Sequence, residues 1–230
     1  MRRNQSLSAC PSRRETIWGF SYMAFELLLL PELLHAMNPW MRLPEAELNF
    51  VFFLLNFLAL SLILHDYLGR SLQQVWRHPA YFCQAVILGG AAYYACFHAV
   101  NYIIDLLAPG YANLNDSSIA SMAGSRSFLM AVGTVILVPP AEECLYRGLI
   151  FRNLYGKSRW AAYAVSILAF ALVHVLGYVG TYSPLHLTMA VLQYLPAGLC
   201  LAWAYTKADT VFAPIFIHAL VNAISLSKLR

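Results

Sequence analysis

The chain reads VILVPPAEECLYRGLIFRN at residues 135–153, an apolar stretch that holds two adjacent acids and an arginine. A charged group near the centre of a bilayer costs several kcal/mol, so each one needs a partner or a function. Glu143 and Arg147 are four residues apart on one helix face, where they can form a buried ion pair. Glu142 lies about 100° away around the helix, which leaves this second acid available for chemistry.

A proline pair precedes the acids in the same stretch. Pro139 and Pro140 each remove a backbone donor and crowd the preceding turn, so we expect the incoming helix to break there. A new helix would then begin at the acids, where its unpaired N–H groups and positive dipole end favour a carboxylate. Burial in apolar surroundings opposes ionisation, and the two opposed effects suit a general base.

The composition around this stretch assigns the chain to a membrane. Of its 230 residues 60% are hydrophobic and 11% are charged, and the mean hydropathy is +0.59. We predict an all-α, polytopic transmembrane helix bundle of about seven spans (six to eight), with a polar cavity inside it for catalysis. The expected spans are 17–37, 49–67, 80–107, 127–154, 160–179, 186–205 and 209–226.

The basic residues predict an orientation in the membrane. Of the 15 Lys and Arg residues, ten flank the spans on the side of the N-terminus, four lie on the opposite side, and Arg147 lies inside a span. Because cytoplasmic loops collect positive charge, we expect a multi-pass protein of the bacterial inner (cell) membrane with a cytoplasmic N-terminus. The net charge of +4 is then explained by the basic residues that face the lipid bilayer, and we expect no nucleic acid as a partner.

Two later spans carry histidines at helical spacing from a second residue. Phe170 precedes His174 by four residues, and His218 precedes Asn222 by four, so each pair shares one helix face. At about 1.5 Å per residue, Glu142, His174 and His218 lie roughly 15, 21 and 14 Å from the cytoplasmic ends of their spans. These similar depths predict one buried site that opens toward the cytoplasm.

The simplest alternative reading of these polar groups is structural. A single histidine or asparagine in a membrane helix is more often a contact between helices than a catalytic group. Glu143 and Arg147 can likewise form a purely structural pair. Glu26, Glu32 and His98 match no motif, and we assign them to helix packing or to an interfacial position.

The chain resembles the CPBP family of intramembrane proteases in three motifs, each in its own hydrophobic span: EExxxR at 142–147, FxxxH at 170–174 and HxxxN at 218–222. That family includes the CAAX prenyl endopeptidases of the Rce1 type and the bacterial Abi proteins. We therefore divide the chain into an N-terminal region, 1–126, with a basic cytoplasmic flank and about three spans, and a CPBP-like catalytic core, 127–230, with about four.

The resemblance implies the roles of the site residues. The candidate catalytic residues are Glu142, Glu143, Arg147, His174, His218 and Asn222. By analogy with the family, Glu142 and His174 would activate water, while His218 and Asn222 would stabilise the oxyanion. Zinc is possible, because two histidines and a glutamate from separate helices could hold it, but HExxH is absent and a Glu–His pair can act alone. We therefore expect no cofactor.

The predicted function is that of an intramembrane endopeptidase. It would use Glu/His-activated water to hydrolyse a peptide bond of a membrane-anchored, hydrophobic or C-terminally processed protein or peptide. The alternatives are a non-catalytic membrane partner or bacteriocin-immunity protein and, less favoured because no internal repeat is seen, a small-ion transporter. Residues 108–126 form a long polar loop that could cover the site from outside. The sequence does not indicate an oligomeric state.

Overall fold

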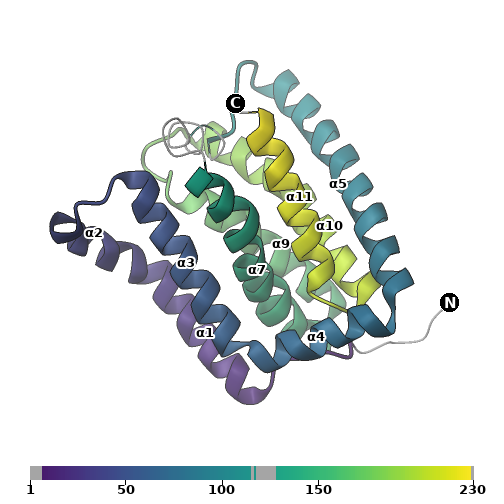
Figure 1. Cartoon of the computed structure of the whole chain (residues 1–230). Coiled ribbons are helices and arrows are strands. Elements are labelled where there is room, and N and C mark those ends of the chain that lie inside the picture. The colour runs from purple at the N-terminus through teal and green to yellow at the C-terminus, as the bar shows by residue number, and fades with distance from the viewer. Residues whose placement is uncertain (1–6, 115–116, 118–127, 229–230) are drawn as a thin grey trace.

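The computed structural model describes residues 7–114, 117 and 128–228 of the chain. Most of these residues are helical (Figure 1). The described residues contain no strand, so the all-α prediction is confirmed. The helices are α1 (Arg13–Leu28), α2 (Leu30–Met41), α3 (Glu45–Ile63), α4 (His65–Arg77), α5 (Pro79–Leu107), the π-helical η1 (Val132–Leu137), α7 (Val138–Glu143), the π-helical η2 (Cys144–Phe151), α8 (Arg152–Tyr155), α9 (Arg159–Leu176), α10 (Pro184–Ala208) and α11 (Phe212–Lys228).

Five helical segments are long and apolar enough to cross a membrane, namely α3, α5, the segment Phe128–Tyr155, α9 and α10. The pair α1 and α2 qualifies only if it counts as one span bent by 53°, and the apolar α11 is shorter, with 17 residues. The first predicted span is therefore not straight. Pro31 lies in the first turn of α2, where its missing N–H is not needed, and the chain changes direction just before it. The protein is an integral, multi-pass membrane protein.

The second predicted span, 49–67, has different limits in the structure. The helix α3 ends at Ile63, and the amphipathic α4 begins at His65 and runs across one end of the bundle (Figure 1). Ser71 on α4 bonds to the hydroxyl of Thr210, at 3.0 Å, in the turn between α10 and α11. The sequence from His65 onward is polar on one face, so it covers the ends of the other helices.

The proline pair does not break the fourth span, contrary to the prediction. One helical segment runs from Phe128 to Tyr155, and Pro139 and Pro140 lie near the start of α7, directly after η1. The hydrogen bonds of a π-helix join residues five apart and widen the turn, which leaves room for the proline rings. The acids therefore lie within a continuous helix and not in its first turn.

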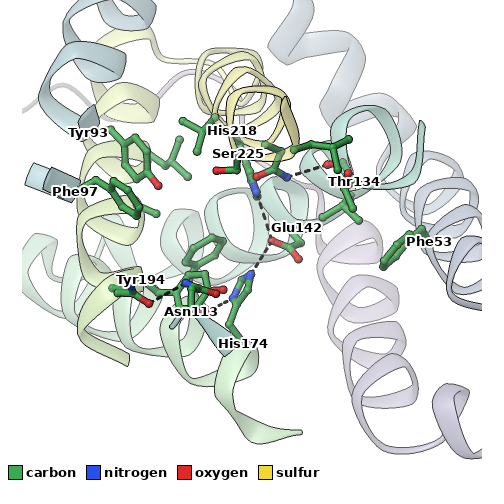
Figure 2. Close-up of a pocket in the computed structure, with 18 of the residues that line it drawn as sticks. Phe53, Tyr93, Phe97, Asn113, Thr134, Glu142, His174, Tyr194, His218 and Ser225 are labelled. Atoms are coloured by element: carbon green, nitrogen blue, oxygen red, sulfur yellow. Dashed lines mark hydrogen bonds and ion pairs between the residues drawn. The ribbon is translucent and has the colours of Figure 1, made fainter. Parts of the chain in front are cut away.

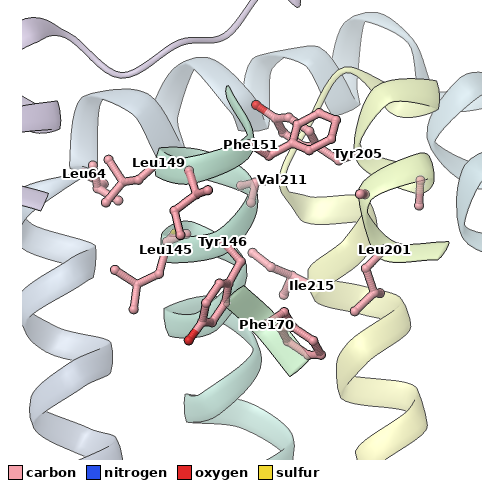
Figure 3. Close-up of a cluster of buried hydrophobic side chains, with 14 of the residues drawn as sticks. Leu64, Leu145, Tyr146, Leu149, Phe151, Phe170, Leu201, Tyr205, Val211 and Ile215 are labelled. Atoms are coloured by element: carbon pink, nitrogen blue, oxygen red, sulfur yellow. The ribbon is translucent and has the colours of Figure 1, made fainter. Parts of the chain in front are cut away.

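The largest hydrophobic core surrounds η2, whose eight residues are all buried (Figure 3). Leu145 and Leu149 face Leu64, at the end of α3, while Phe151 stands edge-on to Tyr205 on α10. Apolar contacts of this kind supply most of the packing energy of a helix between its neighbours. The core fixes the helix that carries the acids at the centre of the bundle.

Candidate active site

A cavity of about 360 Å³ lies between α3, α5, α7, α9, α10 and α11 (Figure 2). Leu201 and Glu142 line one part of the cavity, and Asn49 and Leu226 line another. Asn49 lies near the start of α3 and Leu226 near the end of α11, and both of these helix ends are remote from α4. The prediction that the site opens toward the basic, N-terminal side is therefore wrong, because the side chains at that end pack into the core. Of the predicted covering loop, Asn113 lines the cavity, while 115–116 and 118–126 lie outside the described residues.

Glu142 faces two histidines across this cavity (Figure 2). Its Oε2 lies 3.8 Å from Nε2 of His174 and 3.9 Å from Nε2 of His218. The same oxygen is buried and accepts no hydrogen bond from the described residues. Separations of this length exceed a direct hydrogen bond and match the span of one bridging water. Helices α7, α9 and α11 thus bring together the three residues that the sequence placed at similar depth.

The predicted ion pair between Glu143 and Arg147 is present and fully buried. Arg147 Nη1 donates to Oε1 of Glu143 at 2.9 Å, and both side chains are 0% exposed. Arg147 Nη2 also donates to the carbonyl of Gly198 at 3.3 Å, and the guanidinium lies 4.4 Å from the ring centre of Phe170. A buried pair needs such additional contacts to offset its loss of hydration. They hold Glu143 in place against His218.

The hydrogen bonds of the two histidines determine which ring nitrogen faces the cavity. His174 Nδ1 lies 2.7 Å from the carbonyl oxygen of Phe170, which can only accept, so Nδ1 carries the proton. His218 Nδ1 lies 2.9 Å from Oε1 of Glu143, which accepts as a carboxylate. In a neutral ring the second nitrogen then holds a lone pair. Both Nε2 atoms therefore face Glu142 as proton acceptors.

This arrangement restricts the role that the family resemblance implies for His218. The only N–H of the neutral ring is used on Glu143, so the ring has none to offer to an oxyanion. His218 can donate from Nε2 only after it takes up a second proton.

Asn222 lines the same cavity from α11, one turn after His218. Its Nδ2 donates to the main-chain carbonyl of Thr134 at 2.8 Å, which uses one of the two amide hydrogens. The other hydrogen stays available to a ligand. The structure thus places all six candidate residues in one cluster, in which four line the cavity and the buried pair of Glu143 and Arg147 supports them.

Some residues around the cavity escaped the sequence reasoning. Tyr194 on α10 stacks on the ring of His174, with ring centres 4.2 Å apart. Gln193 accepts a hydrogen bond from Asn113 at 2.8 Å and donates to Asn101. The available signal was a polar glutamine inside an apolar stretch, which by itself predicts only a contact between helices.

Glu26 lies closer to the site than the sequence suggested. Its Oε2 is buried without a hydrogen-bond partner among the described residues, and its charge interacts with that of Glu142. Glu32 and His98, which had the same assignment, are exposed on α2 and α5. Only Glu26 of these three therefore adds to the electrostatics of the cavity.

The arrangement of the donor groups bears on whether the site could hold a metal ion. Among the residues that the structure describes, no three His, Cys, Asp or Glu side chains are grouped so that they could hold a metal ion. The two histidines and Glu142 thus do not form a ready-made zinc site. The expectation that no cofactor is needed stays a prediction.

The second half of the chain is similar to a known protein family. Residues 124–224 match the family model described as type II CAAX prenyl endopeptidase Rce1-like. This segment contains all three motifs, so the predicted resemblance is confirmed for it. No solved structure matches the chain significantly.

Curated relatives are similar at low identity. The UPF0177 protein YxdF of Lactococcus lactis subsp. lactis is 27% identical over 139 residues, which are 57% of this chain and 71% of the relative. The "Putative membrane peptidase YdiL" of Bacillus subtilis is 30% identical over 95 residues, 41% of this chain and 34% of the relative. The UPF0177 protein YaiF of L. lactis is 30% identical over 93 residues, 40% and 37% of the two chains. The matches thus span about a third of the length of the last two relatives.

Proposed function

Because residues 124–224 match a family of membrane CAAX proteases, we propose that the protein is an intramembrane endopeptidase. It hydrolyses a peptide bond of a membrane-anchored, hydrophobic or C-terminally processed protein or peptide. The observation that carries this proposal is the position of Glu142, whose Oε2 lies 3.8 Å from His174 and 3.9 Å from His218 inside a cavity of an apolar bundle.

A single water can bridge Glu142 and either histidine. Two atoms that each lie about 2.8 Å from one water are 3.8 to 3.9 Å apart when the angle at the water is close to a right angle. The water then donates one hydrogen to Glu142 and the other to the lone pair on Nε2 of His174. Glu142 removes one proton as the water oxygen attacks the peptide carbonyl, and Nε2 of His174 takes up the second water proton and passes it to the leaving amine.

The tetrahedral intermediate that follows carries negative charge on the former carbonyl oxygen. The second amide hydrogen of Asn222 is directed to this oxygen, since the first is held by Thr134. His218 adds a donor when both of its nitrogens are protonated, and Glu143 balances the charge of that ring. Collapse of the intermediate breaks the C–N bond and leaves a carboxylate and an amine.

The cavity lining suggests the character of the cleaved segment. Its walls include the aromatic rings of Phe53, Phe97 and Tyr178 together with aliphatic and uncharged polar side chains, and Glu142 is the one charged group among its described lining residues apart from the histidines. Such walls favour an apolar, uncharged stretch of substrate. The carboxylate also repels acidic side chains next to the scissile bond.

The test compares the wild-type chain with Glu142→Gln and His174→Asn at matched abundance in membranes. Each is co-expressed with a panel of membrane-anchored and C-terminally tagged proteins, and new fragments are identified by mass spectrometry. Glutamine keeps the shape of the side chain but removes the base, so we expect fragment formation to fall at least about 100-fold. The variant at His174 should fall similarly.

Two exposed residues of α2 provide matched controls. Glu32→Gln and His35→Asn make the same chemical changes far from the cavity and should retain cleavage. Equal fragments from wild type and both site variants would contradict the protease and favour a scaffold or immunity protein. Substrate flux into vesicles that depends on Glu142, without cleavage, would favour the transporter.

A further inference from the structure

A second cavity, of about 610 Å³, lies at the end of the bundle that α4 covers. Among the described residues, it shares no lining residue with the active-site cavity. It opens to the surface and is bordered by the chain segment before α1, the start of α5, the turn between α8 and α9 and the end of α10. Its described lining residues are Leu7, Ser8, His78, Tyr81, Tyr155, Arg159, Trp203, Thr206, Lys207, Ala208 and Asp209.

Cationic side chains stand over aromatic rings in this cavity. The guanidinium carbon of Arg159 lies 5.4 Å from the ring centre of Tyr155, and Nζ of Lys207 lies 5.9 Å from that of Tyr81. Contacts of this kind restrain long side chains without neutralising their charge. The two cations are therefore held beside one space, and the ring nitrogens of His78 add a possible third donor.

The acid in the lining is already occupied. Both carboxylate oxygens of Asp209 accept from the main-chain N–H of Ser8, at 2.8 and 3.0 Å. Arg159 and Lys207 carry two positive charges against this one carboxylate. The cavity therefore keeps a positive excess even when His78 is neutral, and a bound anion would complement it.

The cavity lies at the level of a membrane surface. It adjoins the turn after α10, which Ser71 of α4 binds, and α4 itself runs across the helix ends (Figure 1). Trp76 and Trp160 are 78% and 87% exposed at this end, and tryptophan concentrates at headgroup depth. The basic residues at the same end are Arg13, Arg14, Arg70, Arg77, Arg152, Lys157, Arg159 and Lys207.

We propose that this second cavity binds the phosphate headgroup of an anionic phospholipid from the leaflet at the α4 end. Arg159 and Lys207 contact the phosphate oxygens, because two converging cations suit a phosphodiester. Trp203 and Leu7 form an apolar wall against which the glycerol and the start of an acyl chain pack. The site is independent of the proposed protease chemistry.

The test uses the full chain, purified in neutral detergent, and measures bound lipid by native mass spectrometry and by the shift in unfolding temperature. Phosphatidylglycerol should bind and stabilise the protein, while phosphatidylcholine at the same concentration should not. In the double variant Arg159→Gln with Lys207→Gln, we expect the affinity for phosphatidylglycerol to fall about 25-fold. Each lost cation accounts for a factor of about five.

A second double variant, Arg13→Gln with Lys157→Gln, removes the same charge from the same end outside the cavity and should keep most of the affinity. Equal losses in the two double variants would overturn the site in favour of general surface charge. Inorganic phosphate tested at the lipid's concentration should not stabilise the protein, and if it does so equally, the ligand is a soluble anion rather than a lipid.

A conservative change guards against a folding defect. If the first double variant unfolds without added lipid, the single variants Lys207→Arg and Lys207→Gln are compared instead, because arginine keeps the charge. Retained binding in the arginine variant and weakened binding in the glutamine variant would support the site. The same binding in both variants would overturn it.

Discussion

Asn222 on α11 donates its side-chain amide to the main-chain carbonyl of Thr134 on η1, at 2.8 Å. The bond joins the HxxxN motif to the helix that carries Glu142. It also fixes the rotation of the amide, so the second hydrogen of Asn222 has a defined direction. One contact thus links the packing of two helices to the geometry of the site.

The first prediction concerns this contact. Asn222→Ala removes both amide hydrogens, so the protein should lose about 1 to 3 kcal/mol of unfolding free energy and turnover should fall about 100- to 1000-fold. Thermal unfolding in detergent and cleavage of an identified substrate measure the two effects. Ser225→Ala, on the same helix and in the same cavity, is the control and should be nearly silent. A loss of stability without a loss of turnover would make Asn222 purely structural.

The second prediction concerns the buried ion pair. Arg147→Met leaves the Glu143 carboxylate buried without its cation and should destabilise the protein by about 3 to 5 kcal/mol. Adding Glu143→Gln removes the unpaired charge and should recover part of the loss. Arg77→Met, at an exposed position, serves as the control. If the double variant is no more stable than the single one, the pair is not the source of the stability.

The third prediction concerns the ring that stacks on His174. Tyr194→Leu removes the stack, which lets the imidazole turn away from Glu142, and turnover should fall about 10- to 100-fold. Tyr194→Phe keeps the ring and should retain most of the activity. Steady-state kinetics distinguish the two variants. Equal turnover in both would show that the stack does not position the histidine.

The fourth prediction concerns metal dependence. Because Glu142 and His174 are placed to activate water between them, cleavage should be unchanged by prolonged treatment with a zinc chelator. Cleavage of the same substrate before and after dialysis measures this. Activity that is lost with the chelator and restored by added zinc would contradict the expectation.

The fifth prediction concerns orientation. The excess of basic residues predicts that the α4 end faces the cytoplasm, so the cavity at the opposite end would open outside. In a background without the other cysteines, Cys10 should resist a membrane-impermeant thiol reagent in intact cells, while Thr181→Cys, in the turn between α9 and α10, should react. The reverse labelling pattern would invert the topology.

Helical spacing predicted much of the site. The four-residue separation of Glu143 and Arg147 was enough to predict their ion pair, and span lengths were enough to bring Glu142 level with both histidines. These relations depend on local helix geometry alone. These predictions hold even when the predicted ends of a span are wrong by several residues.

Other features depend on packing that the sequence does not encode locally. The hydrogen-bond pattern around Pro139 and Pro140 changes to π-helical, so the helix continues where single-residue preferences predict a break. The contact of Gln193 with Asn113 joins residues 80 positions apart, and no motif marks either one. Such long-range pairs follow from the assembled bundle.

The core around η2 has a consequence for membrane integrity. Leu149, Phe151, Tyr67 and Val211 are fully buried, and they fill the bundle between the active-site cavity and the α4 end. In the described part of the chain, the active-site cavity is therefore closed toward the α4 end and does not continue through the bundle as a channel. Water can enter the candidate active-site cavity from one side of the bilayer while the voltage and ion gradients across the bilayer are preserved.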